Sequence, residues 1–337
     1  MILVLNCGSQ SIKYKLFENN FHLVKENRRT VKKDYSRILK EELAGLKKFE
    51  SKIEKVCHRV VHGADKFRDP VAITKTVLAG LKKCSKFAPL HNPYNILGIE
   101  MSSRLFPQTK QIAVFDTGFY KTLPEKAFLY PLPESLRKKY NFRRFGFHGI
   151  SHEYAAGEGA KKIGKPLNRL KIITCHLGGG SSITAIKSGK PVDTSMGFTP
   201  LEGLVMMTRT GDIDPGILLQ LGKEMSFKKT DNILNNMSGV KGICGLSEMK
   251  EVLKAAKKRS AAKTAIDVYV YRIQKYIGSY FALLDGCDLL VFTGAIGAGS
   301  SKIRKMVVRN LNILKNTKIL AIEANEELQI AKKSKKI

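Results

Sequence analysis

The 337-residue sequence contains no tryptophan, only six cysteines, and no apolar run as long as the roughly eighteen residues that a membrane-spanning helix needs. We therefore expect no membrane span. No two cysteines form a Cys-x-x-Cys pair, which excludes the usual zinc and redox-dithiol patterns. We expect reduced structural thiols at Cys7, Cys57, Cys84, Cys175, Cys244 and Cys287. Met1 to Asn6 enter a strand pattern without a basic start or a small-residue cleavage site, which predicts a cytoplasmic protein without a secretory signal.

Acidic residues are also scarce, with 29 Asp and Glu against 59 Lys and Arg, so the net charge is +30. A surface this basic attracts polyanions, and nucleic acid is the obvious one. The lysines are nevertheless spread along the chain, and the tract Lys332 to Lys336 is typical of a solvated tail. We expect no specific nucleic-acid partner, because a compositional bias of the source organism explains the excess equally well.

Length and hydrophobic pattern indicate a mixed α/β protein of two domains with a cleft between them, since 337 residues exceed what one core usually serves. Short apolar runs bounded by turn residues predict strands at residues 2–5, 12–17, 111–115, 171–175, 182–186 and 289–292. Apolar periodicity predicts helices at residues 93–105, 215–221, 246–256 and 264–284. The apolar face expected on the longest helix carries Val268, Ile273, Ile277 and Phe281.

Two segments of the chain, residues 3–13 and 173–183, share one plan of strand, turn with glycine and hydroxyl residues, and second strand. This plan indicates a weak internal duplication. Such loops are often ordinary hairpin turns, but their backbone N–H groups can also face a phosphate. No P-loop and no Gly-x-Gly-x-x-Gly after an early strand is present, so a nucleotide would be held in another way.

Several ordered motifs resemble those of the acetate kinases, which share a superfamily with sugar kinases, actin and the heat-shock chaperone ATPases. The motifs lie at residues 6–9, 58–63, 88–93, 114–117, 145–152, 176–178, 193–215 and 325–328. The resemblance implies a two-domain actin-like fold, built as a duplicated ribonuclease H-like unit. The first domain would span residues 1–118 with 326–337 returning to it, and the second, nucleotide-binding and dimerising, would span 119–325. The chain is shorter than such relatives, and much of the shortfall lies between Phe17 and Lys55.

The resemblance implies reversible, Mg²⁺-dependent phosphoryl transfer between ATP and acetate, by direct in-line attack, giving acetyl phosphate and ADP in a homodimeric enzyme. Such a transfer brings two anions together, so cationic and hydrogen-bonding groups must surround the phosphoryl group. By the same resemblance Arg59 binds the carboxylate, Arg209 stabilises the transition state and His148 donates to a phosphoryl oxygen. Asp116, at the end of an apolar strand, orients Arg59 or the metal environment. Two further histidines, His91 and His176, would line the same cleft.

The resemblance also implies the ligands of the metal and the acyl chain. Asn6 and Glu326 match residues that support Mg²⁺, with Mn²⁺ as the alternative ion. A small apolar pocket for the acyl chain would be formed by Val61, Leu90, Phe147 and Pro200. Such a pocket selects by volume, and one methylene is worth only about 1 to 3 kcal/mol, so propionate is a second candidate substrate.

The nucleotide side departs from the family pattern. The residues expected there are Lys13, His176, Leu177, Gly178, Gly179, Gly180, Glu248, Met249, Lys250, Ala295, Ile296, Gly297, Ala298 and Gly299. The family commonly has Thr-Gly-Gly-Ile-Gly-Glu-Asn where this chain reads Thr-Gly-Ala-Ile-Gly-Ala-Gly, so two polar side chains are lost and Ala295 gains a methyl group. ATP is the expected donor, and GTP or pyrophosphate remain alternatives. A propionate or butyrate kinase, and a non-catalytic nucleotide- or nucleic-acid-binding descendant, also stay open.

Overall fold

The computed structural model describes residues 1–31, 33–89, 91–335 and 337. The chain forms two compact units, Met1–Lys121 with Asn325–Ile337, and Thr122–Ala324. The division expected from the resemblance, after residues 118 and 325, falls close to these bounds. Within the described residues, no helix combines the length and the apolar character that crossing a bilayer requires.

The first unit is built on a six-stranded sheet in the order β3-β2-β1-β4-β6-β5. The first three strands form an antiparallel meander. β4 then pairs parallel with β1 and β6 parallel with β4, while the short β5 runs antiparallel to β6. The strands are β1 (Ile2–Gly8), β2 (Ser11–Phe17), β3 (Leu23–Thr30), β4 (Lys55–Val60), β5 (Val71–Ala72) and β6 (Lys110–Phe115).

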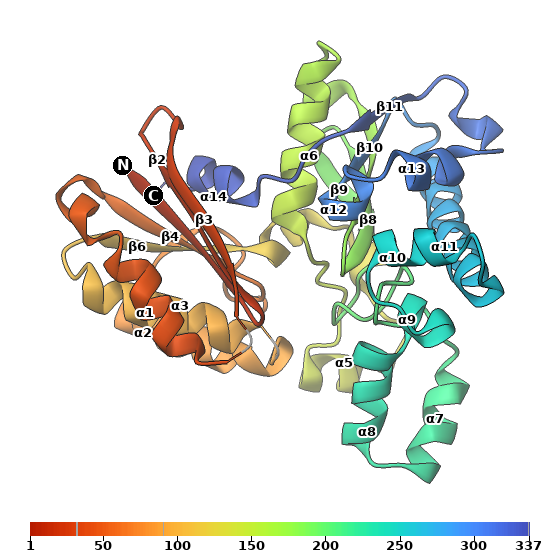
Figure 1. Ribbon diagram of the computed structural model, residues 1–337, viewed down its shortest axis with the longest axis horizontal. Coiled ribbons are helices and arrows are strands. Elements are labelled where there is room, and N and C mark those ends of the chain that lie inside the picture. Colours follow the sequence, from red (N-terminus) through yellow and green to blue (C-terminus); the bar gives the residue numbers. More distant parts are fainter. Residues whose placement is uncertain (32, 90, 336) are drawn as a thin grey trace. The chain divides into compact units, whose positions relative to one another are not determined.

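Helices cover both faces of this sheet, as Figure 1 shows. They are α1 (Tyr35–Ala44), α2 (Lys75–Cys84), α3 (Asn92–Leu105) and the C-terminal α14 (Glu326–Ser334), with 3-10 turns at Lys47–Lys52, Ser85–Phe87 and Asp116–Thr122. Because side chains alternate along a strand, Leu3 and Leu5 of β1 pack in the core with α1 and α3, whereas Asn6 faces α14. β1 is therefore buried almost throughout.

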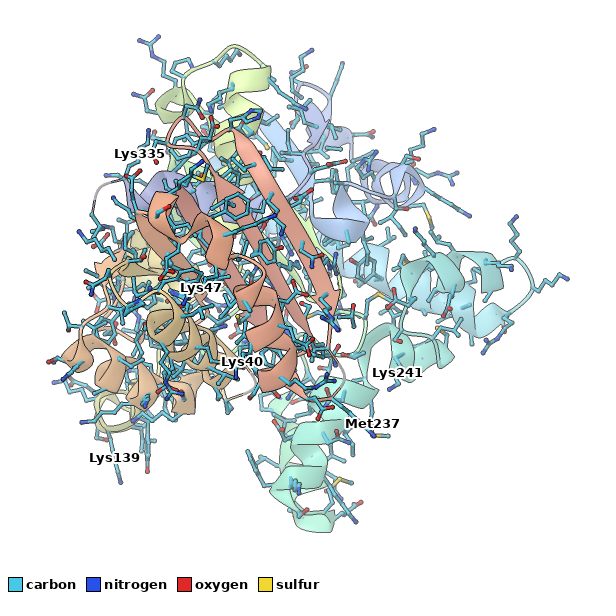
Figure 2. All side chains as sticks on the ribbon, turned by 60° about the vertical axis from the view of Figure 1, so that its left-hand side comes forward. Lys40, Lys47, Lys139, Met237, Lys241 and Lys335 are labelled. Carbon is cyan, nitrogen blue, oxygen red and sulfur yellow. The ribbon has the colours of Figure 1, made fainter. Side chains whose placement is uncertain are left out.

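The prediction of a solvated tail is wrong for Lys332 and Lys333. Both are half-buried in the last turn of α14, which ends at Ser334. The apolar residues Ile330 and Ala331 in the same helix are buried, so the segment is tied down by packing. The lysines labelled in Figure 2, Lys40, Lys47, Lys139, Lys241 and Lys335, lie on separate elements rather than on one.

The second unit repeats the topology of the first in a five-stranded sheet of order β11-β10-β7-β8-β9. β7, β8 and β9 form an antiparallel meander, β10 pairs parallel with β7, and β11 pairs parallel with β10. The strands are β7 (Lys171–Leu177), β8 (Ser181–Lys187), β9 (Lys190–Thr194), β10 (Leu289–Thr293) and β11 (Lys318–Ala321). The shared topology confirms the internal duplication and the mixed α/β class predicted from the sequence.

The core of the second unit lies between its sheet and the long helix α11, with α9, α10 and α13 packed around that helix. Its α-helices are α4 (Glu125–Phe128), α5 (Glu134–Tyr140), α6 (Gly149–Lys162), α7 (Pro215–Glu224), α8 (Phe227–Asn232), α9 (Gly239–Cys244), α10 (Met249–Ala255), α11 (Ser260–Leu284), α12 (Gly294–Gly297) and α13 (Ser301–Val308). Shorter turns are the 3-10 segments Leu167–Arg169 and Asn312–Leu314 and the π segment Ile233–Met237. α6 packs on β7 and β10.

Most predicted elements are confirmed. All six predicted strands are present, and so are the four helices, although α10 begins only at Met249. On α11, Ile273 and Ile277 are fully buried, whereas Val268 and Phe281 are only partly buried at the edge of the core. The six cysteines are free and buried, as expected of structural thiols.

Candidate active site

In the first unit, a buried ion pair joins the ends of two adjacent parallel strands. Arg59 lies on β4 and Asp116 follows β6 directly, so the register of the two strands brings their side chains together. The Arg59 Nε and Nη2 atoms donate to Asp116 Oδ2 at 3.1 and 2.5 Å. Arg59 Nη1 donates to Asn6 Oδ1 at 3.3 Å and lies 3.7 Å from Glu326 Oε2. The structure thus brings together four of the residues predicted from the sequence.

The carboxylates hold Arg59 in its charged form. Burial opposes the charge of Arg59, but the neighbouring Asp116 and Glu326 outweigh it and raise the pKa of the guanidinium. Burial also raises the pKa of Asp116, with Arg59 opposing and the negative charge of Glu326 adding to the shift. The second oxygen of this carboxylate, Asp116 Oδ1, is buried and has no hydrogen-bond partner among the described residues.

The same cluster is rich in oxygen atoms that suit a hard divalent cation. Asn6 Nδ2 donates to Glu327 Oε1 at 3.0 Å and to Glu326 Oε2 at 3.4 Å, which places both glutamates of α14 beside β1. Within the part of the chain that the structure describes, no group of three or more His, Cys, Asp or Glu side chains forms a metal cage. Mg²⁺ commonly uses one or two carboxylates and keeps several waters, so this donor set and the unpartnered oxygen of Asp116 fit the ion.

In the second unit, His148 is held in an unusual backbone conformation directly before α6. Its φ of 56° lies in the left-handed region, which few non-glycine residues adopt. Its ring stacks on that of His176 from β7, with the centroids 4.2 Å apart. His148 Nδ1 lies 2.9 Å from the hydroxyl oxygen of Ser182 on β8. Two predicted histidines therefore meet in the second unit, whereas His91 occupies the N-cap position of α3 in the first unit.

Arg209 lies beside this histidine pair. Its Nη1 atom donates to the Pro200 carbonyl oxygen at 3.2 Å, and no described carboxylate forms an ion pair with it. Burial lowers the pKa of its guanidinium. A methyl group built on Gly180 would lie 3.3 Å from the ring of His148 and 3.6 Å from Arg209 Nη1. The glycine backbone, the imidazole and the guanidinium thus meet at one point.

The predicted nucleotide segments follow two strands of the second sheet. Gly178, Gly179 and Gly180 connect β7 to β8, and no atom of the described residues lies within 4 Å of a methyl group built on Gly179. The second segment follows β10 and begins with the short helix α12, where Ala295 is exposed. The backbone oxygens of Gly297 and Ala298 accept hydrogen bonds from Arg304 Nη1 at 2.9 and 2.6 Å. Arg304, on α13, therefore holds the C-terminal end of α12.

Three of the residues expected at the nucleotide have side chains in the hydrophobic core. Leu177, Met249 and Ile296 are buried among apolar neighbours of the second unit. Only their backbone atoms are therefore in a position to face a ligand. Glu248 and Lys250 are exposed on either side of Met249, and Lys13 borders a separate hollow on β2 and β3 of the first unit.

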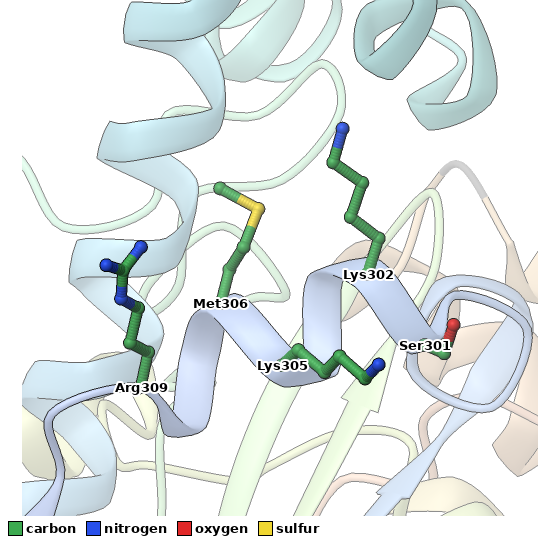
Figure 3. A pocket seen from close by; sticks show the side chains of 5 residues that line it. All are labelled: Ser301, Lys302, Lys305, Met306 and Arg309. Carbon is green, nitrogen blue, oxygen red and sulfur yellow. The ribbon is translucent and has the colours of Figure 1, made fainter.

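A pocket of about 330 Å³ lies along α13 and was not predicted from the sequence. Figure 3 shows its lining on α13 and directly after it, with Lys302 and Met306 extending from one side of the helix. The lining residues are Ser301, Lys302, Lys305, Met306 and Arg309. The three basic residues of this lining, within eight positions directly after a glycine-rich segment, were the signal in the sequence that could have identified this pocket.

The remaining predicted residues are divided between the units. Val61 is buried in the first unit, and Phe147 is buried in the second. Pro200 is half-buried beside Arg209. Leu90 lies outside the described residues. The convergence of Arg59 with His148 and Arg209 joins residues of different units and stays a prediction.

Comparison with known proteins identifies close relatives along the whole chain. A family model described as "Acetokinase family" matches residues 24–335. The curated acetate kinase of Halothermothrix orenii is 42% identical over 393 aligned residues, covering all of this chain and 99% of that protein. Because the alignment is longer than the 337 residues of this chain, the relative carries segments that this chain lacks.

Solved structures agree with the sequence comparison. The acetate kinase of Porphyromonas gingivalis is 34% identical, has a TM-score of 0.91, and the match covers 100% of this chain and 99% of that chain. The propionate kinase of Francisella tularensis subsp. tularensis is 37% identical, has a TM-score of 0.89, and the match covers 98% of each chain. The fold expected from the resemblance is therefore confirmed, and the chain belongs to the acetokinase family.

Proposed function

We propose that this chain is an acetate kinase, which transfers a phosphoryl group reversibly between ATP and acetate to give ADP and acetyl phosphate. Membership of the acetokinase family and 42% identity to a curated acetate kinase support this reaction. The observation that carries the proposal is Arg209, a desolvated guanidinium beside His148 with no ion-pair partner among the described carboxylates. A buried cation in this state is stabilised by an anion, and a phosphoryl group supplies one.

Each unit contributes groups of a different kind to the transfer. In the first unit, Arg59 is fixed by Asp116 and presents a permanently charged fork that can orient the carboxylate of acetate. In the second unit, Arg209 and His148 supply charge and a hydrogen bond to the transferring phosphoryl group. The carboxylate oxygen attacks phosphorus in line, without a covalent enzyme intermediate, once both sets of groups hold the same substrates.

Asn6 and Glu326, with Glu327 and the free oxygen of Asp116, are the groups we propose for Mg²⁺ or Mn²⁺. When bound, the ion supplies positive charge to the phosphate oxygens of the donor. Arg59 lies within the same hydrogen-bonded cluster, and its positive charge partly neutralises the carboxylates. The protein would therefore bind the ion weakly and through few ligands. Such a site suits an ion that binds and leaves together with the nucleotide.

The acyl substrate and the phosphoryl donor are the less constrained parts of the proposal. The 37% identity to a propionate kinase favours propionate as the second acid. On the donor side, Ala298 and Gly299 stand where the resemblance implies Glu and Asn, and Ala295 adds an exposed methyl group in place of a glycine, so GTP or pyrophosphate is the alternative to ATP. The cations of the α13 pocket, Lys302 and Lys305 among them, offer charge to a phosphate chain beside this loop.

A single assay tests the chemistry and the donor together. The chain is incubated with acetate and Mg²⁺ in parallel with ATP, GTP and pyrophosphate, and acetyl phosphate is trapped with hydroxylamine. Propionate and butyrate replace acetate in matched reactions, and kcat/KM is compared across the acids. We expect acetyl phosphate with ATP. A folded protein that gives acyl phosphate with none of the three donors would refute the proposed function and favour a binding descendant.

The quaternary structure and location follow the same proposal. We propose a homodimer formed through the second unit, because α7 and α8 carry large apolar side chains exposed to solvent, led by Leu219 and Phe227 with exposed fractions of 71% and 86%. We also propose a cytoplasmic enzyme, in keeping with six free thiols and no disulfide among the described cysteines.

A further inference from the structure

A chain of short hydrogen bonds links His148 to three residues that were not predicted as site residues. The Ser182 hydroxyl oxygen lies 2.9 Å from His148 Nδ1 and 2.7 Å from His152 Nε2. On the other edge of the His152 ring, Nδ1 lies 2.7 Å from the hydroxyl oxygen of Thr174. All three of these supporting residues, Thr174, His152 and Ser182, are fully buried.

The fold places these groups together from three elements. Thr174 is on β7 and Ser182 on β8, and the antiparallel register pairs His176 with Ser182 and Thr174 with Thr184. Residues two apart on a strand share a face, so the hydroxyl groups of both strands point to one side of the sheet. α6 packs on that sheet, and His152 in its first turns reaches both hydroxyl groups.

The number of hydrogen atoms in this series of hydrogen bonds allows only two arrangements of donors and acceptors. The Ser182 hydroxyl has one hydrogen, so it donates to one histidine and accepts from the other. Burial lowers the pKa of His152 far below its usual range, so this ring is neutral and carries a single N–H. The proton position on His152 therefore fixes the direction of both bonds at Ser182, and with it the proton position on a neutral His148.

The bond lengths favour one of the two arrangements. If the Thr174 hydroxyl donates to His152 Nδ1, that bond is 2.7 Å long, and every bond in the chain is short. In the reverse arrangement the Thr174 hydroxyl must donate to the Thr184 carbonyl oxygen at 3.5 Å, which is the limit of a hydrogen bond. The favoured direction runs from Thr174 through His152 and Ser182 to His148 Nδ1.

We propose that Thr174, His152 and Ser182 form a relay that holds His148 as the neutral tautomer with its proton on Nε2. His148 then donates Nε2–H toward the Gly180 loop without having to become an imidazolium ion. The groups that face His148 agree with a neutral ring. Arg209 approaches the same loop with a positive charge, and His176 stacks on the ring at 4.2 Å. Ser182 and His152 are positioning residues in this scheme, since they act through His148.

The tautomer is measured directly on the full chain labelled with ¹⁵N-histidine, without any activity readout. Long-range ¹H–¹⁵N correlation spectra distinguish Nδ1–H, Nε2–H and doubly protonated rings, and the His148→Gln variant identifies the His148 signals. We expect the Nε2–H pattern in the unmodified protein between pH 7 and 8. A ring protonated on Nδ1, or on both nitrogens, overturns the proposal whatever any variant does.

Two substitutions of Thr174 test the far end of the relay. Thr174→Val keeps the shape but removes the hydroxyl group, and Thr174→Ser keeps the hydroxyl group. We expect the Val variant to lose the single Nε2–H pattern of His148 and to lower kcat by roughly tenfold to a hundredfold with little change in KM for acetate. The Ser variant should keep both. If Thr174→Val does not fold, Ser182→Ala tests the same prediction one bond from His148.

This inference rests on the proposed function only for the rate effect. A protein that shows the expected tautomer and its loss in the Val variant, but transfers no phosphoryl group, keeps the relay and refutes the kinase. An active kinase whose His148 tautomer is the same in the Val variant and the unmodified protein refutes the relay and keeps the kinase.

Discussion

Arg209 Nη1 donates to the carbonyl oxygen of Pro200 at 3.2 Å, and this neutral acceptor is the main polar partner of a largely desolvated guanidinium. The same Nη1 atom lies 3.9 Å from the Met206 sulfur. Elsewhere in the same unit, Arg144 donates to Glu202 at 2.5 Å and has an ordinary carboxylate partner. The two arginines are alike in burial and differ in what neutralises them.

Replacing Arg209 should therefore abolish activity and leave the fold intact. The Arg209→Met variant keeps most of the apolar stem but loses the charge, and we expect kcat/KM to fall by about a thousandfold or more. Its midpoint of urea unfolding should equal or exceed that of the unmodified protein, because no carboxylate loses a partner. The measurements are a coupled kinase assay and urea titration followed by circular dichroism.

Arg144→Met is the matched control for this variant. It leaves the Glu202 carboxylate without its cation, and we expect a loss of about 2 kcal/mol or more in the free energy of unfolding. A strongly destabilised Arg209→Met protein, or one with undiminished turnover, would contradict the role given to Arg209.

A side chain at Gly180 should reduce activity, because it would displace the ring of His148. Gly180→Ala puts a methyl group 3.3 Å from the His148 ring, a contact that requires the ring to move. We expect kcat/KM to fall by roughly tenfold to a hundredfold, because displacement of a catalytic group by a fraction of an ångström is costly. Gly179→Ala meets open space and should retain nearly full activity. Equal losses in the two variants would show that the loop as a whole, rather than the space beside His148, is sensitive.

Buried neutral histidines predict how stability depends on pH. Burial lowers the pKa of His58 to about 4, with a hydrogen bond to Gln111 opposing, and burial lowers the pKa of His62 to about 3. Both values lie below the roughly 6.5 of an unfolded histidine, so only the unfolded chain takes up protons as the pH first falls below 6.5. Stability is complete above that pH and decreases toward pH 4 by about 1.4 kcal/mol per pH unit for each histidine.

Urea unfolding at several pH values between 4.5 and 7.5 measures this slope. His58→Asn should reduce the slope of the unfolding free energy against pH by the contribution of one histidine. His22→Asn, at an exposed histidine, is the control and should leave the slope unchanged. An identical slope for His58→Asn and the unmodified protein would show that the neutral state of His58 does not stabilise the fold.

Introducing charged residues on the proposed dimer surface tests whether the dimer forms there. Leu219→Asp combined with Phe227→Asp places carboxylates on the exposed face of α7 and α8 without touching the core. We expect the molar mass from light scattering to fall from twice 37.6 kDa to the monomer value of 37.6 kDa. Leu283→Asp, on the exposed side of α11, is the control and should remain dimeric. A double variant that keeps the mass of the unmodified dimer would place the interface elsewhere.

The sequence predicted a strand correctly where its apolar pattern is continuous, and missed a strand where charged residues interrupt that pattern. β1 and β10 are nearly continuous apolar runs buried on both faces, and their sequences alone identify them. β4 was not predicted, because Lys55, His58 and Arg59 divide its apolar residues. It is held as a central strand by parallel pairing with β1 and β6, a long-range contact that no window of sequence contains.

The candidate site shows the same division. Arg59, Asp116, His148 and Arg209 were named from motifs, and the structure brings them together as pairs within each unit. The Lys332 to Lys336 tract was misread as a tail because its charge conceals the apolar side of α14. Ser182 and His152 were not singled out, since a hydroxyl group and a second histidine have no signature until the strand register places them behind His148.

The sequence by itself determined the fold class, the internal duplication, the free cysteines and the residues that carry charge to the site, because composition, periodicity and motif spacing are properties of the chain alone. The tertiary structure decided which charges are neutralised and which remain exposed to an anion. It also decided which of two proton positions a buried hydrogen-bond chain imposes on His148. These outcomes depend on desolvation and on distances between side chains far apart in the sequence, and folding alone sets both.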